Sequence, residues 1–217
     1  MELQNKCDIT FFVPCLNEGQ NIVKTLKTIV SAIKETSLSY EILVFDDHSA
    51  DNTLGEVVAF QKCSPDVPVG VKENKSVQGL GRNYVDGAFI GHGKYYMLIN
   101  GDNAEPKETI LAIIQILGTA DMIIPHFGNQ DNRSFFRMQL SVAFTRLVNL
   151  ISGNKIHYYN GPVAHLRYNV MRWSPDTHGF AYQAELITRI LDEGSSFKEV
   201  EIANYDRQEG LTKAFGI

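Results

Sequence analysis

Residues 41–60 read EILVFDDHSADNTLGEVVAF, and a strand gives way to a helix within this stretch. Residues 41–45 form a largely apolar run that is typical of a buried strand, and the acidic pair Asp46 and Asp47 closes it. The residues beyond the pair carry apolar side chains at helical spacing, namely Leu54, Val57, Val58 and Phe60. A strand followed directly by a helix is the unit from which parallel sheets are built.

The same alternation continues on both sides of this stretch. The expected strands cover residues 9–13, 41–45, 67–71, 95–99 and 122–125, with helices between them, one of which covers about 81–92. The residues expected to cap or begin these helices are Asn17, Ser49 or Asp51, and Pro106. Pro68 places the 67–71 strand at a sheet edge, because proline cannot donate to a β-ladder.

The remainder of the chain has a less regular pattern. Residues 134–152 form a long helical pattern with too many apolar residues for one narrow stripe. Such a helix either packs on its own domain or lies at the surface and touches a membrane or a lipid-linked acceptor. The chain then returns with an expected strand at 163–168, a helix at 180–192 and a strand at 197–202.

These elements predict the α/β class, with a mostly parallel sheet and helices on both faces. A chain of 217 residues, 44% of them hydrophobic, is long enough for one domain with a proper core and short for two. We therefore expect a single domain over residues 1–217.

Composition and charge argue against some classes of partner and location. A net charge of −5 argues against a nucleic-acid partner, which would call for a basic face. Three widely spaced cysteines and an N-terminus without an apolar leader predict a cytoplasmic protein with reduced thiols. No run of 18 uncharged apolar residues is present, so we expect no membrane span, while a peripheral contact at the inner membrane face stays open.

Polar side chains follow three of the expected strands. The segments are 14–18, 46–49 and 100–103. In an open parallel sheet ligands bind outside the carboxyl ends of the strands, so these segments are expected to share one site.

The residue types suit a sugar nucleotide and a divalent cation. Glu18, Asp46 and Asp47 are acceptors for the N–H and O–H groups of a base and ribose, unless the acidic pair merely caps a helix. Asp102 is the natural metal ligand, with Asn100 adding an amide oxygen, unless Asp102 only shapes a turn.

A glycine-containing segment offers the anion-binding part of such a site. Residues 78–83 open a helix whose free amides and dipole favour an anion, and Arg82 is placed to contact a phosphate. Gly101 leaves room for a phosphate to approach closely. A structural glycine turn is the alternative for residues 79–81.

Taken together these motifs resemble glycosyltransferase family 2. They are PCLNE at 14–18, VFDDHS at 44–49 with Asp51 and Thr53, GRN at 81–83 and NGD at 100–102. The later part is similar to the dolichyl-phosphate mannose synthase branch, in the segments 179–185 and 199–202 and in the ending formed by Arg207, Gly210, Thr212 and Lys213.

This resemblance implies a GT-A fold and an inverting transfer from a nucleoside-diphosphate sugar, UDP- or GDP-linked, with Mg²⁺ or Mn²⁺. Residues 1–125 would be the nucleotide-binding half and 126–217 the acceptor side with a mobile C-terminal loop. The residues it assigns to the donor are Pro14, Leu16, Asn17, Glu18, Asp46, Asp47, Gly81, Arg82 and Gly101. Asp102 matches the last carboxylate of the family's Asp-x-Asp motif, and Arg207 and Lys213 would lie near the diphosphate and acceptor.

Two positions depart from the family pattern. Asn100 stands where the metal motif has its first carboxylate, so Asp102 and the donor phosphates would carry the metal, with Glu105 as a helper. The stretch YYNG at 158–161 lacks the Asp that polyprenyl-phosphate transferases tend to carry there.

The acceptor decides whether a base is needed. A phosphate monoester is already a nucleophile at neutral pH, because its second pKa is about 6. A sugar hydroxyl needs a carboxylate to take its proton, and Glu185 and Asp176 are the candidates. The other interpretation of Glu185 is a surface pair with Arg189, four residues along a helix.

Three functions remain in competition. The first is a transferase acting on a lipid-linked or glycan acceptor in polysaccharide or glycolipid synthesis. The second is a catalytically weak sugar-nucleotide-binding module or a subunit of a polyprenyl-phosphate transferase, suggested by the thinned metal motif. A nucleotidyltransferase is disfavoured, because its glycine-rich Arg-Lys loop is replaced by residues 14–18.

Overall fold

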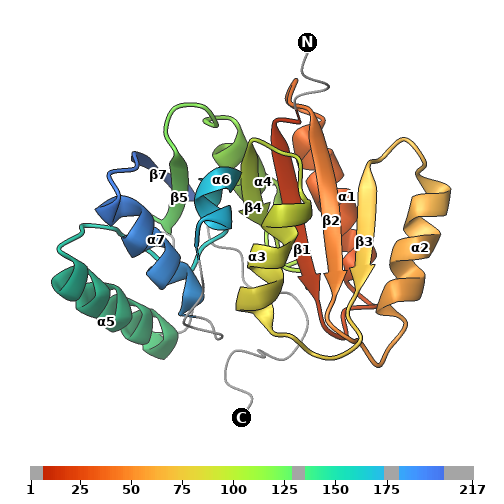
Figure 1. The fold of residues 1–217 in the computed structure, drawn as a ribbon, viewed down its shortest axis with the longest axis horizontal. Helices are drawn as coiled ribbons and strands as arrows, with labels where there is room; N and C mark the ends of the chain where they lie inside the picture. Colours follow the sequence, from red (N-terminus) through yellow and green to blue (C-terminus); the bar gives the residue numbers. More distant parts are fainter. Residues whose placement is uncertain (1–6, 129–134, 174–180, 203–217) are drawn as a thin grey trace.

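A computed structural model of the chain describes residues 7–128, 135–173 and 181–202. Their elements, in chain order, are β1 (Ile9–Cys15), α1 (Ile22–Ile33), β2 (Tyr40–Asp46), α2 (Thr53–Cys63), β3 (Val69–Glu73), α3 (Leu80–Ile90), β4 (Tyr95–Leu98), α4 (Lys107–Ile114), β5 (Met122–Phe127), α5 (Phe135–Ser152), β6 (Ala164–Leu166), α6 (Arg167–Met171), α7 (Tyr182–Asp192) and β7 (Phe197–Ile202). The strands form a seven-stranded sheet with helices on both faces (Figure 1).

The strands lie in the order β3-β2-β1-β4-β6-β5-β7. All neighbouring pairs are parallel except those of β6, which is antiparallel to both β4 and β5. The predicted α/β class with a mostly parallel sheet is therefore confirmed. The short β6 joins the strands of the first 98 residues to β5 and β7, so one sheet connects both parts of the chain.

The central strands are apolar on both faces because both faces are covered. In β1, Phe11 and Val13 pack into one cluster with α1, α2 and α4, whereas Phe12 packs into the other with α3, α6 and α7. Burial on both sides explains why the strands appear in the sequence as continuous apolar runs rather than as alternating ones.

Two predicted strands differ from the structure in ways that bear on the fold. The edge strand starts at Val69, after Pro68, and pairs only with β2, so its edge position is confirmed while its start shifts. The predicted 163–168 strand is wrong at its end, because the backbone turns into α6 after Leu166. Tyr168 therefore lies in a helix, and the side chain of Arg167 donates to the carbonyl of Gly93 at 2.7 Å.

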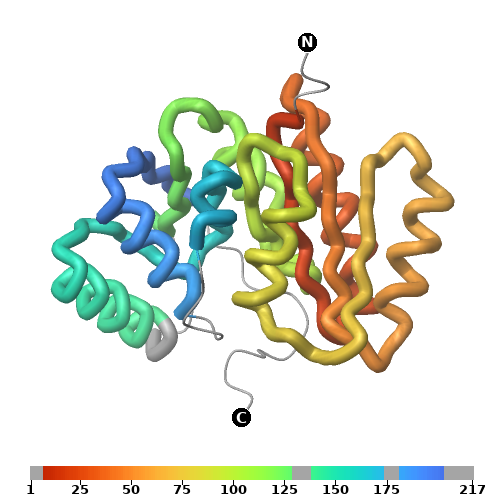
Figure 2. The backbone as a smooth tube through the Cα atoms, in the orientation of Figure 1, coloured from red at the N-terminus to blue at the C-terminus, as the bar shows by residue number. Residues whose placement is uncertain are grey.

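The carboxyl ends of β1 and β2 point to the lower edge of the sheet in the figures. The segment that links β3 to α3 runs along the same edge (Figure 2). This edge is where the sequence places its polar segments.

Candidate active site

The segments that follow β1 and β2 are bonded to each other. The backbone N–H of Asn17 donates to Ser49 Oγ at 2.9 Å, and Asn17 Oδ1 accepts from the backbone of Ala50 at 2.8 Å. The N–H of Glu18 donates to Thr53 Oγ1 at 2.9 Å. The loops after two adjacent strands are thereby held as one unit, which confirms that they share the sheet edge.

Three residues other than glycine have positive φ, and all of them lie at this edge. They are Asn17 (57°), His48 (68°) and Asn103 (57°) among the described residues. Left-handed backbone at such residues is uncommon and tends to gather at functional sites. The prediction that Asn17 caps α1 is wrong, because the helix begins later with Asn21 in the cap position, leaving Asn17 to bond the β2 loop.

The loop after β4 packs closely against the loop after β1. The N–H of Gly101 donates to the carbonyl of Pro14 at 3.2 Å. A side chain at Gly101 would place its Cβ 2.7 Å from Cys15 Sγ and 3.5 Å from Glu18 Cγ. Thr25 of α1 fixes the loop from behind by donating to the carbonyl of Gly101 at 3.0 Å. Glycine is thus required here by the neighbouring loop itself.

Asp46 is buried but keeps one carboxylate oxygen available. Its Oδ1 accepts from the backbone N–H of Ser49 at 3.1 Å and from the Ser49 hydroxyl. Within the described part of the chain, no hydrogen bond reaches its Oδ2. Neither Asp46 nor Ser49 caps α2, which has Asn52 in the cap position, while Asp51 Oδ1 accepts from the first helical N–H at Thr53.

Asp47 is used differently, since both of its oxygens are engaged within the protein. Oδ1 accepts from the side chain of Asn74 and the backbone of Gln78, each at 2.8 Å, and Oδ2 accepts from the backbone of Gly79 at 3.0 Å. Burial alone would raise the pKa of the Asp47 carboxyl, but these hydrogen bonds outweigh it and lower the pKa. Asp47 therefore braces the segment that leads into α3.

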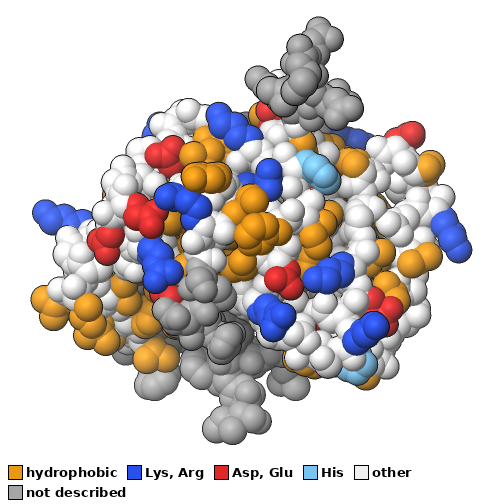
Figure 3. Space-filling view, in the orientation of Figure 1, with side chains coloured by type: hydrophobic (Ala, Val, Ile, Leu, Met, Phe, Trp, Pro, Cys, Tyr) orange, Lys and Arg blue, Asp and Glu red, His pale blue; other side chains and the backbone are white. Residues whose placement is uncertain are grey.

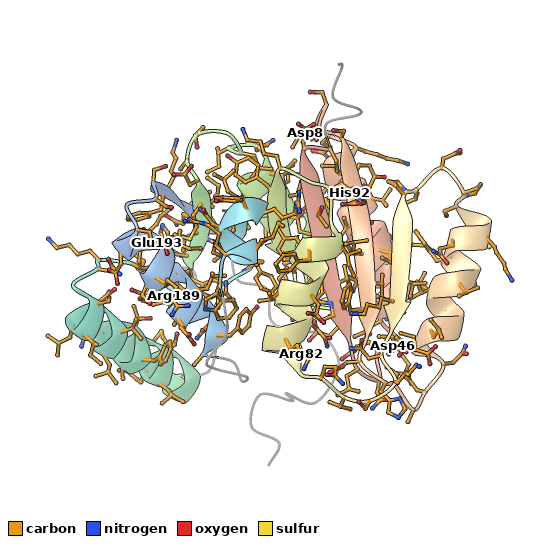
Figure 4. The ribbon with its side chains drawn as sticks, in the orientation of Figure 1. Asp8, Asp46, Arg82, His92, Arg189 and Glu193 are labelled. Carbon is orange, nitrogen blue, oxygen red and sulfur yellow. The ribbon has the colours of Figure 1, made fainter. Side chains whose placement is uncertain are left out.

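The bonds to Asp47 bear on the prediction that the backbone amides of residues 78–83 bind an anion. The amides of Gln78 and Gly79 were expected to meet a phosphate, yet their partner is the Asp47 carboxylate. Gly79 has φ 85° and ψ 158°, a conformation open almost only to glycine, so its structural role is confirmed. Gly81 is buried in the first turn of α3, and Arg82 beside it is exposed. Figure 4 shows Arg82 and Asp46 at the same end of the sheet.

The other residues that the sequence assigns to the donor differ in their exposure at this edge. Pro14 is half-buried and Leu16 is 36% exposed. Glu18 is 8% exposed, and its Oε2 accepts from the side chain of Asn21 at 3.2 Å.

The loop after β4 brings two carboxylates together. Asp102 is half-buried, and its Oδ1 accepts from the N–H of Ala104 at 3.1 Å. The side-chain amide of Asn100 donates to Glu105 Oε1 at 2.7 Å. Burial, and secondly the nearby Asp102 carboxylate, raise the pKa of Glu105 to about 7. Glu105 Oε2 is enclosed and has no hydrogen-bond partner in the described chain.

Of the residues that the sequence assigns to the acceptor side, Glu185 lies among the described residues. Glu185 lies half-buried in the first turn of α7, with its neighbours Ala184 and Leu186 in the core. Asp176, Arg207 and Lys213 lie outside the described residues.

Helix α5 has two unlike sides. Phe144 and Val148 pack against the core, and Asn149 is bonded to the backbone of Ile156 and the hydroxyl of Tyr159. The outer side is apolar and exposed, and includes Leu140 (48% exposed), Leu147 (55%), Leu150 (82%) and Ile151 (78%). In Figure 3 hydrophobic side chains gather at the lower left of the molecule, where Figure 1 shows α5. No helix in the described ranges is both long and apolar enough to cross a bilayer.

The sequence does not indicate that Asn74 and Thr25 hold this edge together, and it marks Thr53 only as part of a motif. Their signal is weak, because each is a single polar residue inside or beside an element and bonds to a segment more than 25 residues away. Only the topology reveals the pairing.

A family model described as glycosyl transferase family 2 matches residues 10–176 and therefore covers every described segment of this edge. The chain belongs to this glycosyltransferase family. The match confirms the resemblance drawn from the motifs and identifies a transferase of glycosyl groups.

Two curated relatives lie in the same branch of the glycosyltransferases. A polyprenol monophosphomannose synthase from Mycolicibacterium smegmatis is 26% identical over 94% of this chain and 80% of its own length. A dolichol-phosphate mannosyltransferase from Pyrococcus furiosus is 27% identical over 72% of this chain, which spans only 44% of that relative.

A solved structure of a glycosyltransferase has a similar fold. The structure of a mannosyltransferase from Pyrobaculum calidifontis, in complex with GDP-Man and Mn²⁺, matches 94% of this chain and 59% of its own with a TM-score of 0.65 and 18% identity. The expected GT-A arrangement is thereby confirmed for this glycosyltransferase.

Proposed function

We propose that the protein transfers a sugar, with inversion, from a nucleoside-diphosphate sugar to a lipid-linked or glycan acceptor, with the help of Mg²⁺ or Mn²⁺. The observation that carries this proposal is the convergence of the loops after β1, β2 and β4 on one sheet edge. That edge offers an available Asp46 oxygen at one end and the Asp102–Glu105 pair at the other.

The Asp46 end suits the base and ribose. Asp46 Oδ2 would accept an N–H or O–H of the nucleoside, and Glu18 is near enough to the β4 loop to take part. Asp47 has a supporting role in this scheme, because its oxygens already hold the turn before α3. That turn sets the position of Arg82, whose exposed guanidinium would contact the diphosphate.

The β4 loop fits a divalent cation. Hard cations take carboxylate and amide oxygens, and Asp102, Glu105 and Asn100 supply that chemistry, with an enclosed Glu105 oxygen that has no protein partner. The described residues contain no group of three His, Cys, Asp or Glu side chains suited to a metal, so donor phosphates would complete the coordination. When bound, the metal stabilises negative charge on the departing diphosphate.

The acceptor would approach from the side of α5 and α7. The relatives named for polyprenol and dolichol phosphates favour a lipid-linked phosphate acceptor, which needs no general base. For a hydroxyl acceptor, Glu185 is the base that we propose among the described residues. The exposed apolar side of α5 would contact the cytoplasmic membrane face where such lipids reside.

A second candidate is a sugar-nucleotide-binding module without turnover. It is favoured by one observation, the amide of Asn100 in place of a carboxylate in the metal loop.

Calorimetry with UDP and GDP, each with and without Mn²⁺, tests the proposal first. We expect one nucleotide to bind, and to bind more tightly with Mn²⁺. A donor-hydrolysis screen across UDP-, GDP- and dTDP-sugars then separates the two candidates, because only the transferase turns donor over. Absence of binding to every nucleotide would refute both.

A further inference from the structure

The loop after β4 carries a side-chain contact that the family motif does not require. Asn100 directs its amide nitrogen to Glu105 Oε1 at 2.7 Å, so the residue that replaces a carboxylate holds another carboxylate in place. An amide is well suited to this, since it is a donor on one side and an acceptor on the other. An Asp at position 100 would instead repel Glu105.

The second oxygen of Glu105 is the unusual part of this contact. Oε2 is enclosed and receives no hydrogen bond from the described residues, and the same loop carries a second carboxylate, Asp102. Buried carboxylate oxygens are normally hydrogen-bonded, because removing them from water without a partner is costly. Asp102 and Glu105 would hold a divalent cation, which would give Oε2 a partner and offset the negative charge of the loop.

A purely structural role explains less. If Glu105 only braced the loop, its Oε1 bond to Asn100 would suffice, and a neutral Gln would accept the same bond without an unpartnered charged oxygen. Thr25 and Thr28 of α1 already fix the loop, by donating to the carbonyl of Gly101 and to Asn103 Oδ1, each at 3.0 Å.

We propose that Glu105, positioned by Asn100, supplies the second carboxylate of the metal site next to Asp102. This inference rests on the proposed metal-dependent function, and deepens it by naming how a motif with one carboxylate keeps two acidic ligands. In this scheme the second acidic ligand of the loop is residue 105 and not residue 100.

The test is a titration of the full chain with Mn²⁺ in the presence of GDP or UDP. Electron paramagnetic resonance measures the concentration of free Mn²⁺ at each step of the titration. Glu105→Gln keeps the side-chain shape and the bond with Asn100, and we expect it to weaken Mn²⁺ binding about tenfold or more, because it removes a charged ligand. The matched control is Glu108→Gln, which removes an exposed acid from the first turn of α4 and should leave Mn²⁺ binding unchanged.

A double variant makes the inference specific. Adding Asn100→Asp to Glu105→Gln returns a carboxylate to the loop, and Mn²⁺ affinity should recover, which loss of folding could not produce. Nucleotide affinity measured without metal confirms that each variant is folded. Unchanged Mn²⁺ affinity in Glu105→Gln, or no recovery in the double variant, overturns the role of Glu105.

The two levels of proposal fail in different ways. If the unaltered protein binds no Mn²⁺ with either nucleotide, the proposed function itself is lost. If it binds Mn²⁺ and nucleotide but Glu105→Gln does so equally well, only the present inference is lost.

Discussion

The strand-end edge and the outer side of α5 are built by opposite means. At the edge, loops from β1, β2 and β4 bond to one another and Asp47 locks the approach to α3, so the polar groups are held before any ligand arrives. On α5, apolar side chains such as Leu150 and Ile151 stand exposed without such bonds. A rigid polar edge suits a small charged donor, whereas an open apolar face suits a larger apolar partner.

Asp102 provides the hardest test of the edge. We expect Asp102→Ala to lower metal-dependent turnover more than about 1000-fold, equal to about 4 kcal/mol, because the charge on the leaving diphosphate loses its counter-ion. Single-turnover donor cleavage with Mn²⁺ measures it, with Glu108→Ala as the exposed control on α4. If Asp102→Ala and Glu108→Ala have equal turnover, Asp102 has no role in catalysis, and the loops of this edge would have a structural role only.

Variants of the adjacent residues Asp46 and Asp47 distinguish a residue that binds the nucleotide from one that stabilises the fold. Asp47→Ala should lower the free energy of unfolding by about 3 kcal/mol, because the amides of Gln78 and Gly79 lose a charged acceptor.

Asp46→Asn keeps the acceptor for Ser49 but turns the available oxygen into a donor, so it should weaken nucleotide binding about tenfold with little change in stability. Urea unfolding and calorimetry measure the two quantities on both variants.

The reverse pattern would be decisive. If Asp47→Ala unfolds like the unaltered protein and loses nucleotide affinity, Asp47 contacts the ligand directly and the edge is less preorganised than described.

His165 tests whether the edge and the α5 side unfold together. It lies on β6 between Tyr96 of β4 and Met122 of β5, and burial lowers its pKa to about 3. The unfolded chain therefore binds the extra proton below about pH 6.5, and stability should fall by up to about 1.4 kcal/mol for each further pH unit of acidification. His165→Leu should lose that part of the slope.

Two spectroscopic probes show whether the two parts of the chain unfold in one transition. The chain has one tryptophan, Trp173, buried in the α7 side of the core, while far-ultraviolet circular dichroism reports all elements. One shared transition at each pH indicates that β6 couples both parts. Two separate transitions would show that the part of the chain with the strand-end edge and the part with α5 unfold independently.

The edge could be predicted from the sequence because its residues follow apolar strands directly. Asp46 and Asp102 are placed by local pattern and by the rule for parallel sheets. The role of Asp47 could not be predicted, since its partners Gln78 and Gly79 come 31 and 32 residues later and the distance is closed only by the topology.

The acceptor side was harder for a different reason. Residues 134–152 showed helical periodicity without a single stripe, and the structure uses Phe144 and Val148 inward while Leu147 and Leu150 face outward. Apolar content alone does not say which side of a helix is covered. One side of α5 packs on its own domain, and contact of the exposed side with a membrane or a lipid-linked acceptor stays a prediction.

The smallest expected effect concerns the exposed side of α5. Leu150→Gln with Ile151→Gln keeps good or fair helix formers at positions 82% and 78% exposed, so the free energy of unfolding should change by less than about 0.5 kcal/mol. Donor hydrolysis in solution should also be unchanged, because these positions lie on α5, outside the strand-end loops. Binding to phosphatidylcholine vesicles, measured by co-sedimentation, should fall several-fold as apolar surface is removed. Phe89→Gln is the matched control, since Phe89 is 59% exposed on α3. Equal losses of vesicle binding from both variants would mean that any exposed apolar residue binds vesicles. The outer side of α5 would then have no specific role in contact with lipid.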